Sequence, residues 1–159
     1  MFREMRRKLQ QLTDAETEEI FRRGSHGVLS VTGDDGYPYG VPLNYCYEDG
    51  KIYFHCAKSG HKTDAILNNP KVCFTVVDRD DVAEELLTTL YRSAIAFGRA
   101  RIVPEEEKYR LHMPLAEKYS GAFPDAIRKS SESSLGNMHL VEITVEHMTG
   151  KQGRELCGK

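Results

Sequence analysis

The sequence predicts a mainly β domain (β plus α) in which six antiparallel strands form a barrel flanked by short helices. Stretches of strand length, rich in β-branched and aromatic residues, follow one another closely, and clusters of Gly, Asp and Asn separate them. Connections this short join antiparallel strands, whereas parallel strands need a long crossover between each pair. The pattern therefore favours a barrel over a stack of strand–helix–strand units.

The six strands are expected at residues 27–32, 37–47, 51–55, 72–77, 91–103 and 138–148. The second of them contains Pro38 and Pro42. Because proline has no amide proton to donate, this strand should be kinked or lie at an edge of the sheet. Gly98 marks a bulge or bend in the fifth strand.

Boundary residues predict the helices. Thr13 and Glu16 match a capping box, which opens a helix that Gly24 ends. A short helix is expected at residues 62–68, and a longer one begins at Pro104 and continues to about Tyr119. The remaining segments are expected to be irregular, with an acidic excursion at 78–89, a loop at 130–134 and a polar tail at 149–159.

The first twelve residues form a basic arm that carries Arg3, Arg6, Arg7 and Lys8. Such an arm is either solvated or packed on a partner subunit, and the sequence leaves both readings open.

Length and composition fit a single domain that spans residues 1–159. The formal net charge of −2 provides no overall positive field for nucleic acid or a membrane surface. No apolar run approaches the roughly 20 residues that cross a bilayer, and the first ten residues lack the apolar core of a signal peptide, so we expect a cytoplasmic protein. The four cysteines include no C-x-x-C pair and are expected to be reduced thiols.

The segment from His55 to Lys62 is the most informative part of the chain. A strand ends there, a small loop with Gly60 follows, and a helix begins. Amide groups at a helix start point toward an anion, and the helix dipole favours negative charge at that end. The side chains of Lys58, Ser59, His61 and Lys62 add further donors. The pattern indicates a phosphate site, and the plain alternative is an ordinary loop with exposed lysines.

Three further stretches are compatible with a ligand. In residues 37–45, a kinked strand offers backbone groups and the Asn44 amide to a planar molecule, although a proline-protected edge strand has the same pattern. Ser93 begins a strand and could reach a phosphate, unless that strand is simply part of the core. Lys151 follows the last strand and could also meet a phosphate. The segment 148–151 is no P-loop, because no Gly-x-x-x-x-Gly precedes it.

Taken together, these stretches resemble the pyridoxamine-phosphate-oxidase-related split-barrel flavoproteins, most closely the nitroimidazole-resistance branch. The resemblance covers about residues 14–151. It is carried by GYPYGVPLNY at 36–45, YFHCAKSGHK at 53–62, NPKVCF at 69–74, Arg92-Ser93 with Gly98, and MTGK at 148–151.

The resemblance implies a split β-barrel that binds FMN between the two subunits of a homodimer, with FAD as the alternative. By position, Val41, Pro42, Leu43 and Asn44 would line the isoalloxazine ring. Lys58, Ser59, His61 and Lys62 would surround the phosphate, with Ser93 near it and Lys151 as a further contact. His55 would contact the cofactor near the ring and is the candidate catalytic residue. The chain has His61-Lys62 where pyridoxamine-phosphate oxidases usually carry Arg-Lys, and it lacks their aromatic, arginine-rich end, which disfavours pyridoxamine phosphate as substrate.

Two alternatives to a flavin site follow from the residues alone. Cys46, His55, Cys56, His61 and Cys73 are potential metal ligands, but none of them shows the paired spacing of a structural zinc site. Cys56 next to His55 is the candidate for an activated nucleophile, but neighbours on a strand point to opposite faces.

The expected function is that of an FMN-binding oxidoreductase. FMN would accept electrons from a nicotinamide donor or a reductase and pass them to a small, planar, nitroaromatic-like acceptor. His55 would orient the acceptor or donate a proton. A flavin-binding carrier, sensor or storage protein without turnover is the alternative. The sequence does not identify the physiological acceptor or the electron donor.

Overall fold

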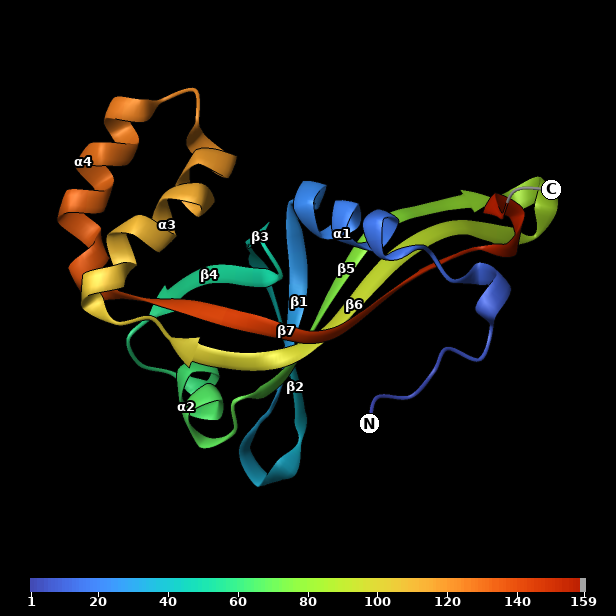
Figure 1. Cartoon of the computed structure of the whole chain (residues 1–159), viewed down its shortest axis with the longest axis horizontal. Helices are drawn as coiled ribbons and strands as arrows, with labels where there is room; N and C mark the ends of the chain where they lie inside the picture. Colours follow the sequence, from blue (N-terminus) through green and yellow to red (C-terminus); the bar gives the residue numbers. More distant parts are fainter. Residues whose placement is uncertain (158–159) are drawn as a thin grey trace.

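One antiparallel sheet of seven strands forms the framework of the protein in the computed structural model, which describes residues 1–157 except for the side chain of Glu132. The strands are β1 (His26–Thr32), β2 (Pro38–Asn44), β3 (Cys46–Glu48), β4 (Lys51–Ala57), β5 (Lys71–Ala83), β6 (Thr88–Ile102) and β7 (Met138–Gln152). Their order in the sheet is β2-β1-β5-β6-β7-β4-β3 (Figure 1). The prediction of a mainly β protein is confirmed.

The predicted number of six strands is wrong, because the expected second strand divides at Tyr45 into β2 and β3. The backbone N–H of Tyr45 donates to the hydroxyl of Tyr119, and its carbonyl lies 2.8 Å from the same hydroxyl, so Tyr45 leaves the strand ladder. β2 and β3 lie at opposite ends of the strand order, although Tyr45 alone separates them in the chain. The sheet therefore curls until its two ends meet, but no described ladder joins β2 to β3 and the sheet is not closed.

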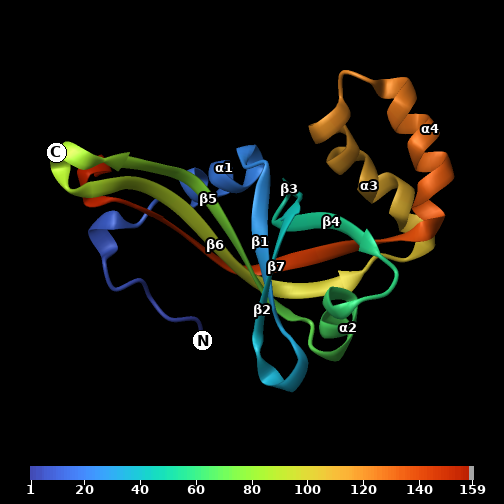
Figure 2. The same ribbon diagram turned by 180° about the vertical axis from the view of Figure 1, so that it is seen from behind.

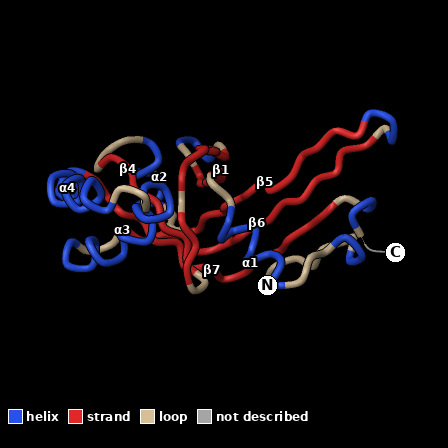
Figure 3. Tube along the Cα trace, turned by 90° about the horizontal axis from the view of Figure 1, so that it is seen from above, coloured by secondary structure: helices blue, strands red, loops and turns tan. Residues whose placement is uncertain are grey.

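The acidic excursion expected at residues 78–89 is also wrong. β5 and β6 continue through this segment as a long hairpin that projects away from α3 (Glu105–Ser120) and α4 (Pro124–Ser134), as seen from above in Figure 3. The register of the two strands shifts between Val77 and Arg79, and this bulge takes Asp78 out of the ladder. The Asp78 carboxylate instead accepts hydrogen bonds from Arg23. The acidic segment is therefore part of a regular β-hairpin, in which the strands pair on both sides of the bulge at Asp78.

The helices largely follow the prediction. Thr13 and Glu16 form both hydrogen bonds of the capping box at the start of α1 (Asp14–Arg23). The expected helices at 62–68 and 104–119 correspond to α2 (His61–Asn68) and α3. The loop expected at 130–134 is wrong, because α4 runs through its serines. Ile127, Ser131 and Leu135 recur every four residues there and are buried, so packing of one face stabilises a serine-rich helix.

The basic arm and the start of the expected polar tail both have defined places on the sheet. β7 extends to Gln152, so the first residues of the tail expected at 149–159 belong to a strand, and residues 158–159 lie outside the described part of the chain. In the basic arm, the Leu12 N–H donates to the Gly150 carbonyl, and the Phe2 ring stacks on His147 at 4.8 Å. The arm therefore rests on its own chain.

The core lies on both faces of the curled sheet. Inside the curl, α1 and α2 cover a large cluster that includes Phe21, Leu29 and Phe74. On the outer face of β4 and β7, Leu115 of α3 packs on Leu140 in a second, smaller cluster. Figure 2 shows α3 and α4 standing over this end of the sheet. No helix in the described part of the chain is both long enough and apolar enough to cross a membrane.

Candidate functional site

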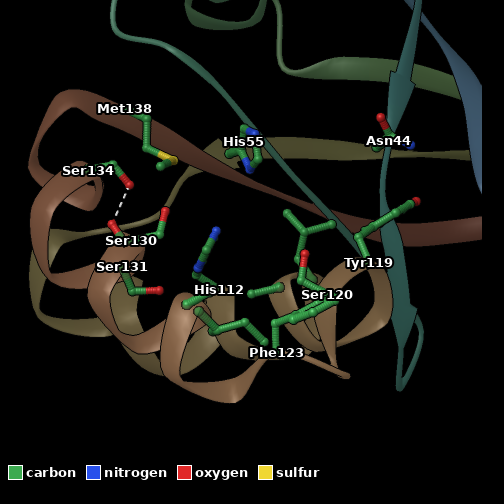
Figure 4. A pocket seen from close by; sticks show the side chains of 14 residues that line it. Asn44, His55, His112, Tyr119, Ser120, Phe123, Ser130, Ser131, Ser134 and Met138 are labelled. Carbon is green, nitrogen blue, oxygen red and sulfur yellow. Dashed lines mark hydrogen bonds between the residues drawn. The ribbon is translucent and has the colours of Figure 1, made fainter.

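A cavity of about 600 Å³ lies between α3, α4 and the adjoining strands (Figure 4). Its lining is mainly apolar, with several hydroxyl groups and two imidazoles. Among the residues that the structure describes, no Asp, Glu, Lys or Arg side chain lines it. The lining residues are Asn44, His55, His112, Leu115, Ala116, Tyr119, Ser120, Phe123, Ala126, Ile127, Ser130, Ser131, Ser134 and Met138. Concave, mostly apolar sites with a few polar groups are typical of small-molecule binding.

His55 and His112 face one another across this cavity (Figure 4). Their ring centroids are 5.8 Å apart, and the rings are tilted by 41°. His55 is exposed on β4, whereas His112 of α3 is buried, and the Nδ1 atom of His112 has no hydrogen-bond partner. Desolvation lowers the pKa of both imidazoles, reinforced by the charge of Lys62 at His55 and by His55 at His112. Both shifts favour the neutral form of the imidazole.

Asn44 links the cavity to the end of β2. Its side-chain amide donates to the Ser25 carbonyl at 3.0 Å, which fixes the orientation of the group at the rim. The hydroxyl of Tyr119 bonds to the Tyr45 backbone and lies within hydrogen-bond distance of the same Ser25 carbonyl. Lys118 donates to the Gly24 carbonyl at 2.6 Å. These contacts fasten the end of α3 to the corner between β2 and β3.

The predicted phosphate segment lies at the other side of His55, where β4 leads into α2. Gly60 precedes α2 with φ +122°, a backbone conformation that favours glycine, and no side chain caps the helix. The first amide groups of α2 are thus open to an anion. The side chains of Lys58 and Ser59 are exposed, and Lys62 is half-buried. Lys58 lies 3.8 Å from Glu105, a loose contact between two exposed side chains.

His61 has a different environment from its neighbours. Its ring stacks on Tyr39 at a centroid distance of 4.1 Å, and its Nε2 atom accepts the backbone N–H of Asp34 at 3.3 Å. These contacts tie the start of α2 to the turn between β1 and β2. In this conformation the His61 side chain serves the packing of that turn, and its place around a phosphate stays a prediction.

Exposed and half-buried side chains alternate along β2, the strand that is predicted to line the flavin ring. Pro42 and Asn44 are exposed, whereas Val41 and Leu43 are half-buried, with Leu43 packed against the core. β2 is the outermost strand of the sheet order, so one side of its backbone is unpaired. A ligand at this edge would meet the side chains of Pro42 and Asn44 and those backbone groups of the strand that do not pair with β1.

Ser93 and Lys151 lie far from Lys58 in the same chain. They pair with each other at the distal end of β6 and β7, whereas Ala57 pairs with Met138 at the opposite end of β7. At about 3.3 Å per residue, the strand between these ends is about 40 Å long. Figure 1 shows the two ends of β7 on opposite sides of the molecule. One chain therefore does not bring Ser93 and Lys151 to the predicted phosphate segment.

The cysteines do not gather into a reactive site. Cys56 is buried on the inner face beside Thr63, while His55 on the same strand is exposed on the outer face. The two side chains point apart, as expected from strand geometry. Within residues 1–157 no group of three or more His, Cys, Asp or Glu side chains is arranged to hold a metal ion.

Sequence reasoning missed the residues of α3 and α4 that complete the cavity. His112 and Tyr119 lie in a predicted helix, but nothing in the local pattern shows that this helix folds back over β4. The only available signal was the apolar spacing of Leu111 and Leu115, which marks a buried helix face without identifying its partner.

Comparison with known proteins identifies the family. A family model described as Pyridoxamine 5'-phosphate oxidase matches residues 13–152. No curated protein matches the chain. Similar solved structures include a candidate 5-nitroimidazole antibiotic resistance protein from Bacteroides thetaiotaomicron, with 23% identity, TM-score 0.74 and coverage of 89% of this chain and 86% of that chain.

Two mycobacterial structures share the fold as well. A conserved hypothetical protein of Mycobacterium tuberculosis has 22% identity and TM-score 0.82, and the alignment covers 98% of this chain and 94% of the other. A protein of Mycobacterium smegmatis described as binding FAD and haem has 14% identity and TM-score 0.80, and the alignment covers 94% of this chain and 76% of the other. The predicted resemblance is confirmed, and the chain belongs to the pyridoxamine 5'-phosphate oxidase family.

Proposed function

We propose that the protein is a split-barrel flavoprotein that holds the phosphate of FMN at the start of α2 and the flavin ring beside Asn44 and His55. The observation that carries this proposal is the uncapped start of α2, with Lys58 and Lys62 beside it, at the end of the strand that bears His55. The net charge of −2 gives the chain no overall attraction for an anion, so a local group of donors such as this one must supply it.

FMN is favoured over FAD by the residue pattern that resembles the FMN-binding branch. FAD remains the alternative, because the similar Mycobacterium smegmatis protein is described as binding it. Titration with both cofactors distinguishes them, since a site built for one terminal phosphate should bind FMN more tightly.

A homodimer would complete the site. The outer face of β1, β5 and β6 carries the exposed apolar side chains of Val28, Val77 and Ile95. Val28 lies in register with Thr75, which lies in register with Ile95, so these side chains form one continuous surface. Exposed apolar surfaces of this kind mark interfaces. We expect the partner's copy of Ser93 and Lys151 to approach the phosphate, and Ile95→Asp to yield monomers in light scattering.

The expected activity is electron transfer to a small acceptor. A bound flavin would supply the redox chemistry, while the chain binds and orients it and limits the access of water. His55 can present a neutral imidazole to an acceptor. The alternative is a carrier, sensor or storage protein. In anaerobic assays with nicotinamide donors and nitro compounds, His55→Ala should lower turnover and spare FMN binding. A flavin-loaded protein without turnover would favour the alternative.

The phosphate site is tested by FMN titration of the single variants Lys58→Ala and Lys62→Ala. A hydrogen bond to a charged group contributes about 1.5–3 kcal/mol, so each variant should raise the Kd for FMN about tenfold or more. Lys129→Ala on α4 is the matched control, because Lys129 is exposed and lies outside the cavity lining. Equal Kd values for all four proteins would overturn the assignment.

A further inference from the structure

A second cavity, of about 1090 Å³, lies where the basic arm meets the segment that follows β7, at the end of that strand far from α3 and α4 (Figure 1). Four of its lining side chains are cations and one is a carboxylate. The lining residues are Arg6, Arg7, Lys8, Leu9, Gln10, Arg154, Glu155 and Cys157. The proposed flavin site uses none of them, so this cavity is a separate feature of the molecule.

The two segments that form this basic cavity are fastened to one another. The Cys157 thiol donates to the Leu9 carbonyl at 3.2 Å, which joins the arm to the turn η5 (Arg154–Leu156). On the arm, Gln10 is buried at the end of the short helix η1 (Lys8–Gln10). The backbone that carries the four cations is therefore ordered before a ligand binds, which lowers the entropic cost of binding.

Three of the four cations lack a carboxylate partner. Lys8 forms a salt bridge with Glu4 at 2.8 Å. In the described part of the chain, no ion pair includes Arg6, Arg7 or Arg154, and all three residues are exposed. The acidic tip of the β5–β6 hairpin contributes no residue to the cavity lining. Neighbouring like charges repel one another, so an anion bound between these arginines would relieve their repulsion.

The cationic groups of the cavity favour phosphate over other anions. A guanidinium group presents a planar fork of donors that matches two oxygens of a phosphate. One arginine lies on η5 and two lie on the arm, so a ligand with two linked phosphate groups can contact both segments at once. The volume leaves room for more than the phosphates, and the exposed side chain of Leu9 offers apolar surface to the rest of a nucleotide.

From these observations we infer that the basic cavity is a second anion site, which binds a ligand with two linked phosphate groups through Arg6, Arg7 and Arg154. The inference does not rest on the proposed flavin site, because the cavity shares no residue with the start of α2. A nucleotide diphosphate and free pyrophosphate share this chemistry, and experiment separates them.

The test measures pyrophosphate binding by calorimetry in the FMN-free variant Lys58→Ala/Lys62→Ala, which lacks both lysines of the proposed phosphate site at α2. Pyrophosphate should bind with one equivalent and more tightly than orthophosphate, because orthophosphate cannot contact both segments. In this background, Arg7→Ala and Arg154→Ala should each raise the Kd for pyrophosphate about fivefold, as expected for the loss of one exposed ion pair. Arg154→Lys keeps the charge but not the planar fork, and it should restore only part of the affinity.

Arg99→Ala is the matched control, because it removes one positive charge from a residue that pairs with Glu146 and does not line the cavity. An equal loss of affinity in Arg99→Ala and Arg154→Ala would indicate a diffuse effect of charge and overturn the inference. So would equal affinity for pyrophosphate and orthophosphate, or no binding of pyrophosphate. With ADP as a further probe, tighter binding than that of pyrophosphate identifies a nucleotide as the source of the diphosphate, and weaker binding identifies the free anion. Because no measurement uses FMN or the α2 lysines, failure here is distinct from failure of the proposed flavin site.

Discussion

The carboxylate of Glu142 should control the acid stability of the sheet that carries His55. It is 2% exposed on β7 and accepts hydrogen bonds from Arg101 at 2.8 Å, Lys51 at 3.1 Å and Tyr53 at 3.0 Å. Burial alone would raise the pKa of Glu142, but the hydrogen bonds from these three residues outweigh it and lower the pKa to about 2 from 4.5. The group thus joins β4, β6 and β7.

The size and sign of the effect follow from this pKa. A fall from 4.5 to about 2 corresponds to about 3 kcal/mol of folding free energy. Lys51 and Arg101 are 40% and 42% exposed, so solvent screens part of the interaction, and we expect about 2 kcal/mol. Because the pKa is lower in the folded state, this stabilisation is complete above pH 4.5. It is lost as the pH falls toward 2.

Urea denaturation of the wild type and of Glu142→Gln at pH 7 and pH 3 measures this contribution. The variant should be about 2 kcal/mol less stable at pH 7, and the difference should shrink by more than half at pH 3. Glu146→Gln is the control, since Glu146 pairs with Arg99 in an exposed salt bridge and should change stability little. A loss for Glu142→Gln that is the same at both pH values would refute the reasoning.

Three further predictions address the elements around the site. Thr13→Ala removes the capping box of α1 and should lower the free energy of unfolding by about 1 kcal/mol in a urea titration. An unchanged free energy of unfolding would show that the cap does not stabilise the fold. Tyr119→Phe removes the hydroxyl that ties α3 to the corner of the sheet, and amide exchange in α3 should accelerate unless other contacts hold the helix. His55 and His112 should both titrate below pH 6.5 in NMR, and Lys62→Ala should raise the pKa of His55. Titration above 6.5 would contradict their desolvation.

Local signals predicted the fold wherever neighbouring residues determine the backbone. The capping residues of α1, the glycine before α2 and the alternation of the strands identified most elements. The corner at Tyr45 was not predictable, because its backbone bonds to a tyrosine 74 residues later in the chain. The serines of α4 disfavour a helix locally, and only burial of Ile127 and Ser131 against other elements decides their structure.

The candidate site was likewise predicted only where its residues are neighbours in the sequence. The segment 55–62 is continuous in sequence, so its anion-binding character could be read from the residues themselves. His112 and the serines of α4 reach the cavity only through the packing of two helices over β4, which no local pattern encodes. Ser93 and Lys151 lie at the opposite end of β7 from Lys58 in one chain, a separation that no local pattern reveals, and their place near the phosphate stays a prediction.

Gel filtration of the protein after incubation with one equivalent of FMN tests the central proposal most directly. FMN should elute with the protein and give the visible absorption bands of a bound flavin, and Lys62→Ala should elute with less of it. A wild-type protein that elutes colourless, with all FMN recovered in the small-molecule fraction, would contradict the proposed flavin site.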